Sequence, residues 1–463
     1  MSTHHANMNA KELQTSIALA AVYALRMLGM FLIIPVFALY APTLVGGDNK
    51  AWVGFAMGGA YGLTQAILQL PLGMASDKWG RKKIIYIGLL IFALGSFLAS
   101  YADNIYLLAF ARAVQGAGAV SAAITALLAD LTREQVRTRA MAMIGISIGI
   151  TFAASLVLGP VLDHIIGVKG IFTLTGILSL VAIVAIHFLV PNPQELKIHD
   201  DTQAKTSFLP IVLKDAQLLR LNFGIFALHT AQMSLFMVLP IALVKLGLPK
   251  TEHAHLYLPI VIAGFVFMIP AIIYGEKKQK LKQVFVFSIA LMVIAQLCLA
   301  FSLDHFVLVC SSLVIYFIAF NILEATLPSL ISKIAPTQAK GTAMGVYNTA
   351  QSLGLFAGGA GGGLIFAHFS FLGIFTFCSI LMIIWLILAI TAAKPPAAKN
   401  IMFSLSKIWQ NHSQSLTALL TQQSGILEIA FSEDNQTLYL KITQEDADLI
   451  TDQIEQILSG EPK

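Results

Sequence analysis

Twelve long apolar stretches constrain the fold of this 463-residue chain more than any other feature of its sequence. A helix needs about 20 apolar residues to cross a bilayer, and most of the stretches reach that length. Charged residues make up only 11% of the chain, against about 25% in soluble domains. We therefore predict an all-α membrane protein. The expected spans are residues 15–41, 52–73, 84–101, 105–130, 140–165, 168–190, 216–246, 254–275, 283–303, 306–331, 340–367 and 370–392.

The predicted spans form two groups of six, separated by a polar segment. This arrangement suggests duplication, and two parallel halves around a central cavity are a known plan of transporters. We expect a first transmembrane half at 12–192, a cytoplasmic connector at 193–215, a second half at 216–393 and a cytoplasmic domain at 400–463.

The positive residues predict the orientation of the chain. Alternate loops are rich in Lys and Arg, whereas the loops between them hold only Lys50, Lys169, Lys245 and Lys250. The positive-inside rule places the basic loops and both termini in the cytoplasm. Because the net charge of +5 lies beside membrane spans, it does not indicate a nucleic-acid partner.

The tail after about residue 400 has the composition of a soluble domain. Strands are expected at 401–405, 425–431 and 437–442, and helices at 415–423 and 447–458. This βαββα order is close to a ferredoxin-like fold. The tail contains no Cys, and Cys298, Cys310 and Cys378 all lie in apolar runs. We therefore predict neither a metal site nor a disulfide.

A short basic stretch lies between the second and third spans: Gly73-Met-Ala-Ser-Asp77-Lys-Trp-Gly80-Arg81-Lys82-Lys83. We expect it to be a cytoplasmic loop, with glycines that allow a tight turn. Asp77 is unusual because it follows an apolar helix so closely. The spacing resembles the loop signature of the major facilitator superfamily; the alternative is an ordinary basic stop-transfer loop.

The resemblance implies contacts around this loop. In the family, the loop acid meets the start of the eleventh helix, here near Lys340-Gly341, and the loop arginine pairs with the acid that ends helix four. Asp77, Arg81, Asp130 and Arg133 are therefore expected to form a cytoplasmic gate, since an acid favours a helix N-terminus. The alternative for Asp130 is a solvated surface charge.

Two arginines lie inside predicted spans, where charge is costly. Arg26, in Arg26-Met-Leu-Gly29…Pro35, resembles the first-helix motif of drug–proton antiporters in the same superfamily. Arg112, in Arg112-Ala-Val-Gln115-Gly116, resembles a motif that is implicated there in proton coupling. We expect both arginines to take part in proton coupling; the alternative is that they are structural cations.

Glu324 is the only acid deep in an apolar run. Burial disfavours the charged form of a carboxyl group, which can then exchange protons near neutral pH. Glu324 is thus our first candidate for the protonation site, the alternative being a neutral acid in one structural hydrogen bond. His229 is a further coupling candidate or a structural residue. Gln115, Gln232 and Asn321 are expected to line the cavity.

Close helix contacts are also expected. Glycines recur at intervals of four in the second, fifth and eleventh spans, which allows helices to approach one another. The glycines are Gly54 and Gly58, Gly145 and Gly149, and Gly354, Gly358 and Gly362.

One motif departs from the family pattern. Antiporters of this group carry a glycine-rich sequence around Gly-Pro in the fifth helix. Here Gly159-Pro160 remains, but Asp163 and His164 replace the final glycines.

The resemblance implies an inner-membrane, proton-driven carrier of a type that has a small cytoplasmic ferredoxin-like domain. Our leading hypothesis is a bacterial exporter of small, largely apolar molecules that acts as a monomer by alternating access. It would be no enzyme and need no cofactor beyond the proton gradient. Two alternatives remain: proton symport of a nutrient, and a membrane sensor that acts through its tail. The tail itself is expected to bind a ligand, self-associate or brace the cytosolic helices.

Overall fold

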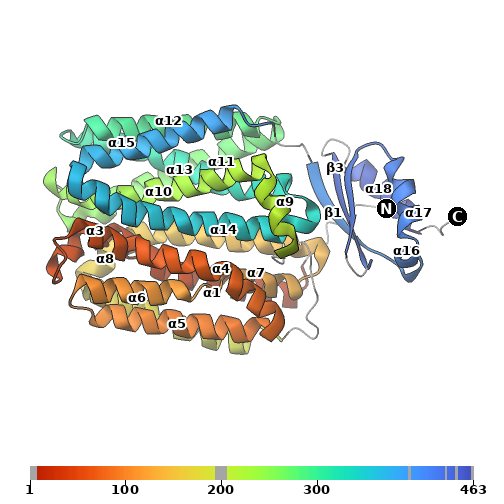
Figure 1. The fold of residues 1–463 in the computed structure, drawn as a ribbon, viewed down its shortest axis with the longest axis horizontal. Coiled ribbons are helices and arrows are strands. Elements are labelled where there is room, and N and C mark those ends of the chain that lie inside the picture. The colour runs from red at the N-terminus through yellow and green to blue at the C-terminus, as the bar shows by residue number, and fades with distance from the viewer. Residues whose placement is uncertain (1–7, 193–205, 395–397, 433–434, 444–446, 460–463) are drawn as a thin grey trace.

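The apolar runs form long helices that lie side by side, and the polar tail forms an α+β unit at one end of them (Figure 1). The computed structural model describes all residues except 1–7, 193–205, 395–397, 433–434, 444–446 and 460–463. We call the end of the bundle next to the tail the tail side, and the opposite end the distal side.

The first half contains α1 (Ala10–Phe31), α2 (Ile34–Tyr40), η1 (Ala41–Thr43), α3 (Lys50–Gly54), η2 (Phe55–Gly59), α4 (Ala60–Trp79), α5 (Arg81–Tyr101), α6 (Ile105–Ala117), α7 (Ser121–Asp130) and α8 (Glu134–Leu189). The second half contains α10 (Ala216–Lys245), η4 (Lys250–Glu252), α11 (His253–Lys277), α12 (Leu281–Phe301), α13 (Phe306–Ile334), η5 (Thr337–Ala339), α14 (Lys340–Phe356), η6 (Ala357–Gly361) and α15 (Gly362–Ile390).

Within the described residues, nine helical segments are long and apolar enough to cross a membrane. Two of them contain a residue in the left-handed region, Gly167 in α8 and Ser370 in the segment that ends with α15, so each of these two makes two spans. The run Lys50–Trp79, in which η2 is a π-helical turn, supplies the remaining span. The predicted membrane fold of twelve helices in two halves is confirmed.

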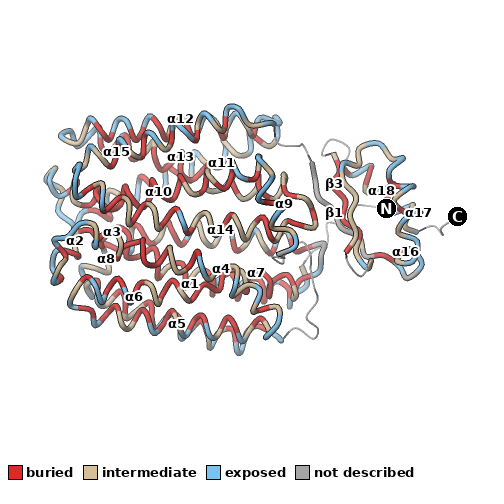
Figure 2. The backbone as a smooth tube through the Cα atoms, viewed as in Figure 1, coloured by how far each residue is buried: buried red, intermediate tan, exposed pale blue. Residues whose placement is uncertain are grey.

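Large apolar side chains cover the outside of the bundle. Leu90 of α5, Ile262 of α11 and Ile387 of α15 are all exposed, and exposed positions recur along the outer helices (Figure 2). A soluble protein rarely exposes contiguous apolar surface on this scale. These side chains therefore face the hydrocarbon of the bilayer.

The two halves meet backbone to backbone near the distal side. A Cβ atom on Gly54 would lie 2.1 Å from the carbonyl oxygen of Gly359, and one on Gly58 would lie 3.1 Å from that of Leu355. The expected close contact is thus confirmed for the second and eleventh spans. It is wrong for the fifth span, because a Cβ on Gly145 would meet no atom within 4 Å.

The stretch predicted as a cytoplasmic loop, Gly73–Lys83, is helical almost throughout. α4 continues to Trp79 and α5 begins at Arg81, so Gly80 alone separates them. Gly80 has φ of 97° and open space around it, so its conformation requires glycine. The loop prediction was wrong because helices continue past the apolar residues that mark a span.

The end of the predicted connector is helical. Residues 193–205 lie outside the described residues, but η3 (Thr206–Phe208) and α9 (Leu209–Lys214) precede α10. Val212 of α9 is fully buried. The end of the connector is therefore a short helix packed on the second half.

The tail confirms the predicted order of strands and helices. It contains β1 (Ala398–Ser404), α16 (Lys407–Asn411), α17 (Ser413–Thr421), β2 (Ile426–Phe431), β3 (Thr437–Thr443) and α18 (Ala447–Ser459). The sheet is antiparallel with β3 in the centre, as in a ferredoxin-like split βαβ unit. Leu438, Leu440 and Ile442 of β3 pack in one core with Leu416 of α17 and Ile454 of α18.

The other face of the sheet docks on the connection between α13 and α14. The Lys441 ammonium donates to the Ile334 carbonyl (3.4 Å), the Thr337 amide donates to the Glu428 carboxylate (3.1 Å) and the Gln338 side chain donates to the Phe431 carbonyl (2.6 Å). Burial lowers the pKa of Lys441. The tail is thus fastened to the second half.

Candidate functional site

Three polar side chains from different helices meet inside the second half. Glu324 lies on α13, His229 on α10 and Gln351 on α14. The Gln351 amide nitrogen lies 2.8 Å from Nε2 of His229 and 3.4 Å from Oε1 of Glu324, while Oε2 of Glu324 lies 3.9 Å from the same ring nitrogen. The Glu324 side chain is 29% exposed. Its Oε2 atom is buried without a hydrogen-bond partner among the described residues, so the carboxyl group faces the protein interior.

The hydrogen bonds assign the proton on His229. Its Nδ1 lies 3.3 Å from the Ile225 carbonyl oxygen, which can only accept, so Nδ1 carries the hydrogen. Its Nε2 faces the Gln351 amide nitrogen, which can only donate, so Nε2 is an acceptor. With these partners His229 is a neutral imidazole whose hydrogen is on Nδ1.

Two buried arginines lie in the first half and share Tyr61. Arg26 of α1 donates to the Ser121 hydroxyl (2.9 Å) and to the Tyr61 hydroxyl (3.3 Å). Arg112 of α6 lies over the Tyr61 ring, 4.9 Å from its centroid, and donates to the carbonyl oxygen of Met57 (3.0 Å). These acceptors are neutral, so they do not balance the positive charges of the two guanidinium groups.

Tyr23 lies between the arginines of the first half and the Glu324 cluster of the second half. Its side chain on α1 lies within electrostatic range of Arg26 and also of Glu324. Tyr23 is therefore a side chain of the first half that lies near both Arg26 and the Glu324 cluster.

The three residues expected to line the cavity are all buried in this conformation. Gln115 accepts from Arg112 (2.7 Å) and donates to the Ser96 hydroxyl (2.7 Å), so it supports the arginine instead. Asn321 packs against Gly264 of α11. Gln232 is also buried. In this conformation Gln115 and Asn321 are held between helices of their own half, and their cavity-lining role stays a prediction.

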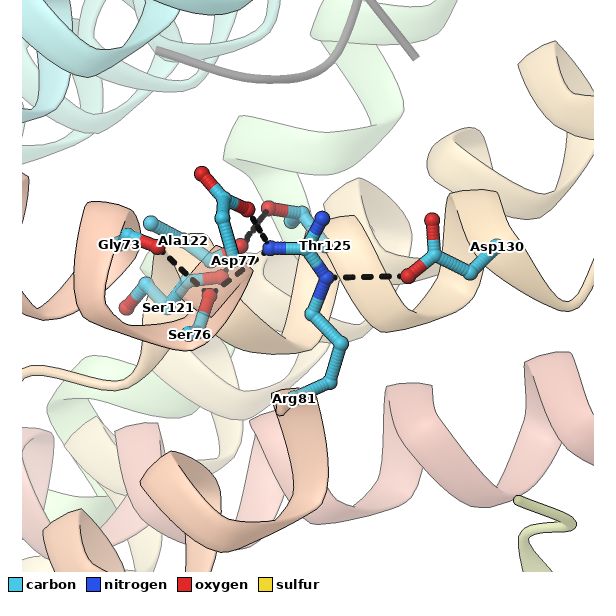
Figure 3. Close-up of polar contacts among 8 residues, drawn as sticks. All are labelled: Gly73, Ser76, Asp77, Arg81, Ser121, Ala122, Thr125 and Asp130. Carbon is cyan, nitrogen blue, oxygen red and sulfur yellow. Dashed lines mark hydrogen bonds and ion pairs between the residues drawn. The ribbon is translucent and has the colours of Figure 1, made fainter. Parts of the chain in front are cut away.

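A second polar network joins α4, α5 and α7 on the tail side (Figure 3). Arg81 points back from the start of α5, and its Nε lies 3.0 Å from Asp130 while its Nη1 donates to Ser76 (2.9 Å) and contacts Asp77. Gly73 accepts from the Ser76 hydroxyl (2.6 Å). The expected pairing of Arg81 with Asp130 is confirmed, and Asp130 is a buried partner rather than a solvated charge.

Two expected gate contacts differ from the structure. Asp77 contacts Arg81, and among the described residues it makes no hydrogen bond or ion pair to the start of α14. Arg133 has a different acidic partner. Its guanidinium binds Glu12 of α1 instead, with nitrogen–oxygen distances of 2.8 and 2.9 Å. The network around Arg81 is therefore internal to the first half, and Arg133 ties α1 to the start of α8.

The second half has a related contact with opposite signs. Lys333 near the end of α13 donates to Glu276 near the end of α11, with distances of 2.7 and 2.8 Å. In the first half the cation lies at the turn after α4 and the acid ends α7. In the second half the acid lies in the last turn of α11 and the cation lies in the last turn of α13. Both halves thus brace their tail-side ends by an ion pair.

The family model described as "Major Facilitator Superfamily" matches residues 19–359 and 279–421, which is most of the transmembrane region. The chain belongs to the major facilitator superfamily. The stretch Gly73–Lys83, whose spacing resembles the loop signature of this family, lies within the matched residues. In the structure this stretch is helical on both sides of Gly80.

Members of the superfamily also appear among similar proteins and structures. The chain is 42% identical to the inner membrane transport protein YajR of Escherichia coli, covering 94% of this chain and 95% of that protein. It is 24% identical to multidrug resistance protein 2 of Bacillus subtilis, over 74% and 88% of the two chains. A solved bacterial homologue of the human lysosomal transporter Spinster, inward-facing and occupied, shares the fold with a TM-score of 0.64 at 14% identity, covering 83% of this chain and 96% of that one. The protein is thus a multi-pass membrane transporter.

The departure from the family motif in the fifth span has a structural counterpart. Asp163, in place of a glycine, accepts from Lys250 of the second half at 3.3 Å. The Lys50 ammonium of the first half lies 4.2 Å from the ring centroid of Phe366 of the second. Both contacts lie on the distal side, so they hold the halves together there.

Asp163→Asn is expected to loosen the distal contact. Because the Lys250 side chain is 58% exposed, the pair contributes at most about 1 kcal/mol, and distal opening should rise up to about fivefold. Spin labels at Tyr101 and Phe301, at the distal ends of α5 and α12, would report the longer distance. Asp103→Asn is the matched control, because Asp103 pairs with Lys169 within the first half. If Asp163→Asn and Asp103→Asn gave the same distribution of distances between the labels, the Asp163–Lys250 pair would not be what holds the halves together on the distal side.

Several residues of these networks were missing from the predicted site, among them Gln351, Tyr61, Ser121 and Glu12. Gln351, Tyr61 and Ser121 are polar residues inside predicted spans, and many polar residues in spans have only a packing role. The sequence offered a clearer signal for Glu12, because with Asn9 it forms an Asn-x-x-Glu capping box at the start of the first apolar run. Among the described residues no group of His, Cys, Asp and Glu could hold a metal ion.

Proposed function

We propose that this transporter is proton-coupled and exports small, largely apolar molecules by alternating access. The observation that carries the proposal is the cluster of Glu324, His229 and Gln351. The cluster holds one carboxyl group inside the second half, and Tyr23 of the first half lies within electrostatic range of both Glu324 and the buried Arg26. A proton moving across the membrane potential supplies about 2.3 kcal/mol per 100 mV to the cycle.

The surroundings of the cluster favour an apolar substrate. The ring of Phe320 lies 6.2 Å from that of His229 and 5.4 Å from that of Phe152, which belongs to the first half. Phe152 also contacts Phe31 at 5.1 Å. Aromatic faces from both halves suit apolar or aromatic substrates, and the multidrug resistance protein of Bacillus subtilis is a distant relative.

The remaining parts of the proposal concern location. The similarity to an Escherichia coli inner membrane transporter supports a bacterial inner membrane, and the Lys and Arg distribution supports cytoplasmic termini. The carrier is proposed to work as a monomer with no cofactor. The docked tail then braces the connection between α13 and α14 on the cytoplasmic side.

Proton symport of a nutrient is the second candidate, because Asp163 occupies a glycine position of the antiporter motif. Reconstituted vesicles with an imposed pH gradient separate the two. Export predicts that substrate moves against the proton flow and that adding substrate to one side releases protons on that same side. Substrate and proton moving together would establish symport, and substrate movement that ignores the gradient would reject coupling.

A further inference from the structure

An apolar groove runs along the outside of the second half, between α11, α12 and α13. It encloses about 580 Å³ and is lined by Phe267 and Tyr274 of α11, Phe287 of α12 and Ile318 of α13, among others. Phe287 is 63% exposed and Phe267 is 55% exposed. The groove therefore opens to the hydrocarbon of the bilayer and not to the polar centre between the halves.

Three exposed lysines lie at the tail-side mouth of this groove. Lys277 ends α11, and Lys278 and Lys280 lie in the turn before α12, where Gln279 has φ of 54°. Lys280 donates to the hydroxyl of Tyr274 at 3.3 Å, and Tyr274 is itself part of the groove wall. The cations and the apolar channel are thus parts of one surface.

The nearby acid does not neutralise these lysines. Both carboxylate oxygens of Glu276 bind Lys333 on the inner side, at 2.7 and 2.8 Å. Lys282 is engaged separately, since its ammonium donates to the Ile390 carbonyl at 3.0 Å. The positive charge of Lys277, Lys278 and Lys280 therefore faces the membrane surface.

We propose that this groove binds an anionic phospholipid. An acyl chain fills the apolar channel between α11 and α13, and the phosphate headgroup meets the lysines at its mouth. Basic pockets between transmembrane helices bind anionic headgroups, and each lysine near the surface strengthens the attraction. A neutral lipid would fill the channel equally well but would leave the three cations without a counter-charge. The site lies outside the transport pathway, and it stands whichever substrate is carried.

The test is native mass spectrometry of the full-length purified protein with phosphatidylglycerol or with phosphatidylcholine of matched chains. We expect one phosphatidylglycerol to be retained in preference. The triple substitution Lys277→Gln, Lys278→Gln, Lys280→Gln should weaken its binding at least about tenfold and leave phosphatidylcholine unchanged. Ala271 lines the groove, so Ala271→Phe narrows the apolar channel. This variant should weaken retention of phosphatidylglycerol without altering any charge.

The matched control is Lys78→Gln, Lys83→Gln, Lys214→Gln, which removes three exposed lysines away from the groove. Unchanged binding in this control, with loss in the groove variants, supports the site. Equal retention of the two lipids by the wild-type protein would overturn the proposal, as would equal losses in the two triple variants. Competition by soluble glycerol phosphate at the same concentration would also overturn it, because the acyl channel would then contribute nothing.

Discussion

Replacing Glu324 by glutamine is expected to reduce substrate-dependent proton flux by two orders of magnitude or more. Glutamine keeps the shape of the side chain and its contact with Gln351 at 3.4 Å, but it cannot take up or release a proton. His229 cannot substitute for it in this arrangement, because both ring nitrogens are committed to Ile225 and Gln351. Flux is measured in reconstituted vesicles with a trapped pH dye.

Substrate binding gives a second measure of the same substitution. In the wild-type protein the affinity for substrate should change with pH, because Glu324 can be either protonated or ionised when substrate binds. In Glu324→Gln the affinity should be independent of pH, since the titrating group is gone. The two measurements together separate lost coupling from lost binding.

Glu252→Gln is the matched control for this experiment. Glu252 is an exposed acid on the distal side that contacts His255 at 2.9 Å, so the same chemical change there should leave flux and its pH dependence intact. Proton flux in Glu324→Gln within twofold of the control would show that the proton travels by another route.

The transmembrane fold follows from the sequence because each span is a local property. About 20 apolar residues in a row have one stable solution in a bilayer, and this holds without knowledge of the partners. Span ends are less certain, as Gly73–Lys83 illustrates. Polar residues after a span can form a loop or can continue the helix beyond the membrane. Here the helices continue, and the chain turns at Gly80 alone, which has a positive φ.

The polar centre was only half predictable. Glu324, Arg26 and Arg112 stand out because charge in an apolar run is costly. Gln351 does not stand out, since it became relevant only when α14 packed beside α10 and α13. Asn321 shows the converse: it shares a helix with Glu324 but faces α11. Which face of a helix meets the cavity depends on packing between spans, and one sequence does not contain that information.

Removing Arg81 is expected to have the largest effect on stability of any single substitution in the tail-side network. Its guanidinium serves Asp130, Ser76 and Asp77 at once, and the side chains of Arg81 and Asp130 are 2% and 1% exposed. Arg81→Ala leaves a buried carboxylate without its cation, which costs about 3–5 kcal/mol. Reversible unfolding in mixed micelles measures the loss.

Two further variants separate charge from geometry at this site. Arg81→Ala combined with Asp130→Asn should recover much of the lost stability, because the buried charge is removed together with its partner. Arg81→Lys should fall between, since an ammonium group cannot reach several acceptors in a fixed plane. Arg133→Ala is the comparison: it also removes an arginine from an acid, but that side chain is half exposed and Glu12 keeps the backbone amides of Asn9 and Arg133. If Arg133→Ala destabilised the protein as much as Arg81→Ala, or if Asp130→Asn gave no recovery, the buried ion pair would not be what holds α4, α5 and α7 together.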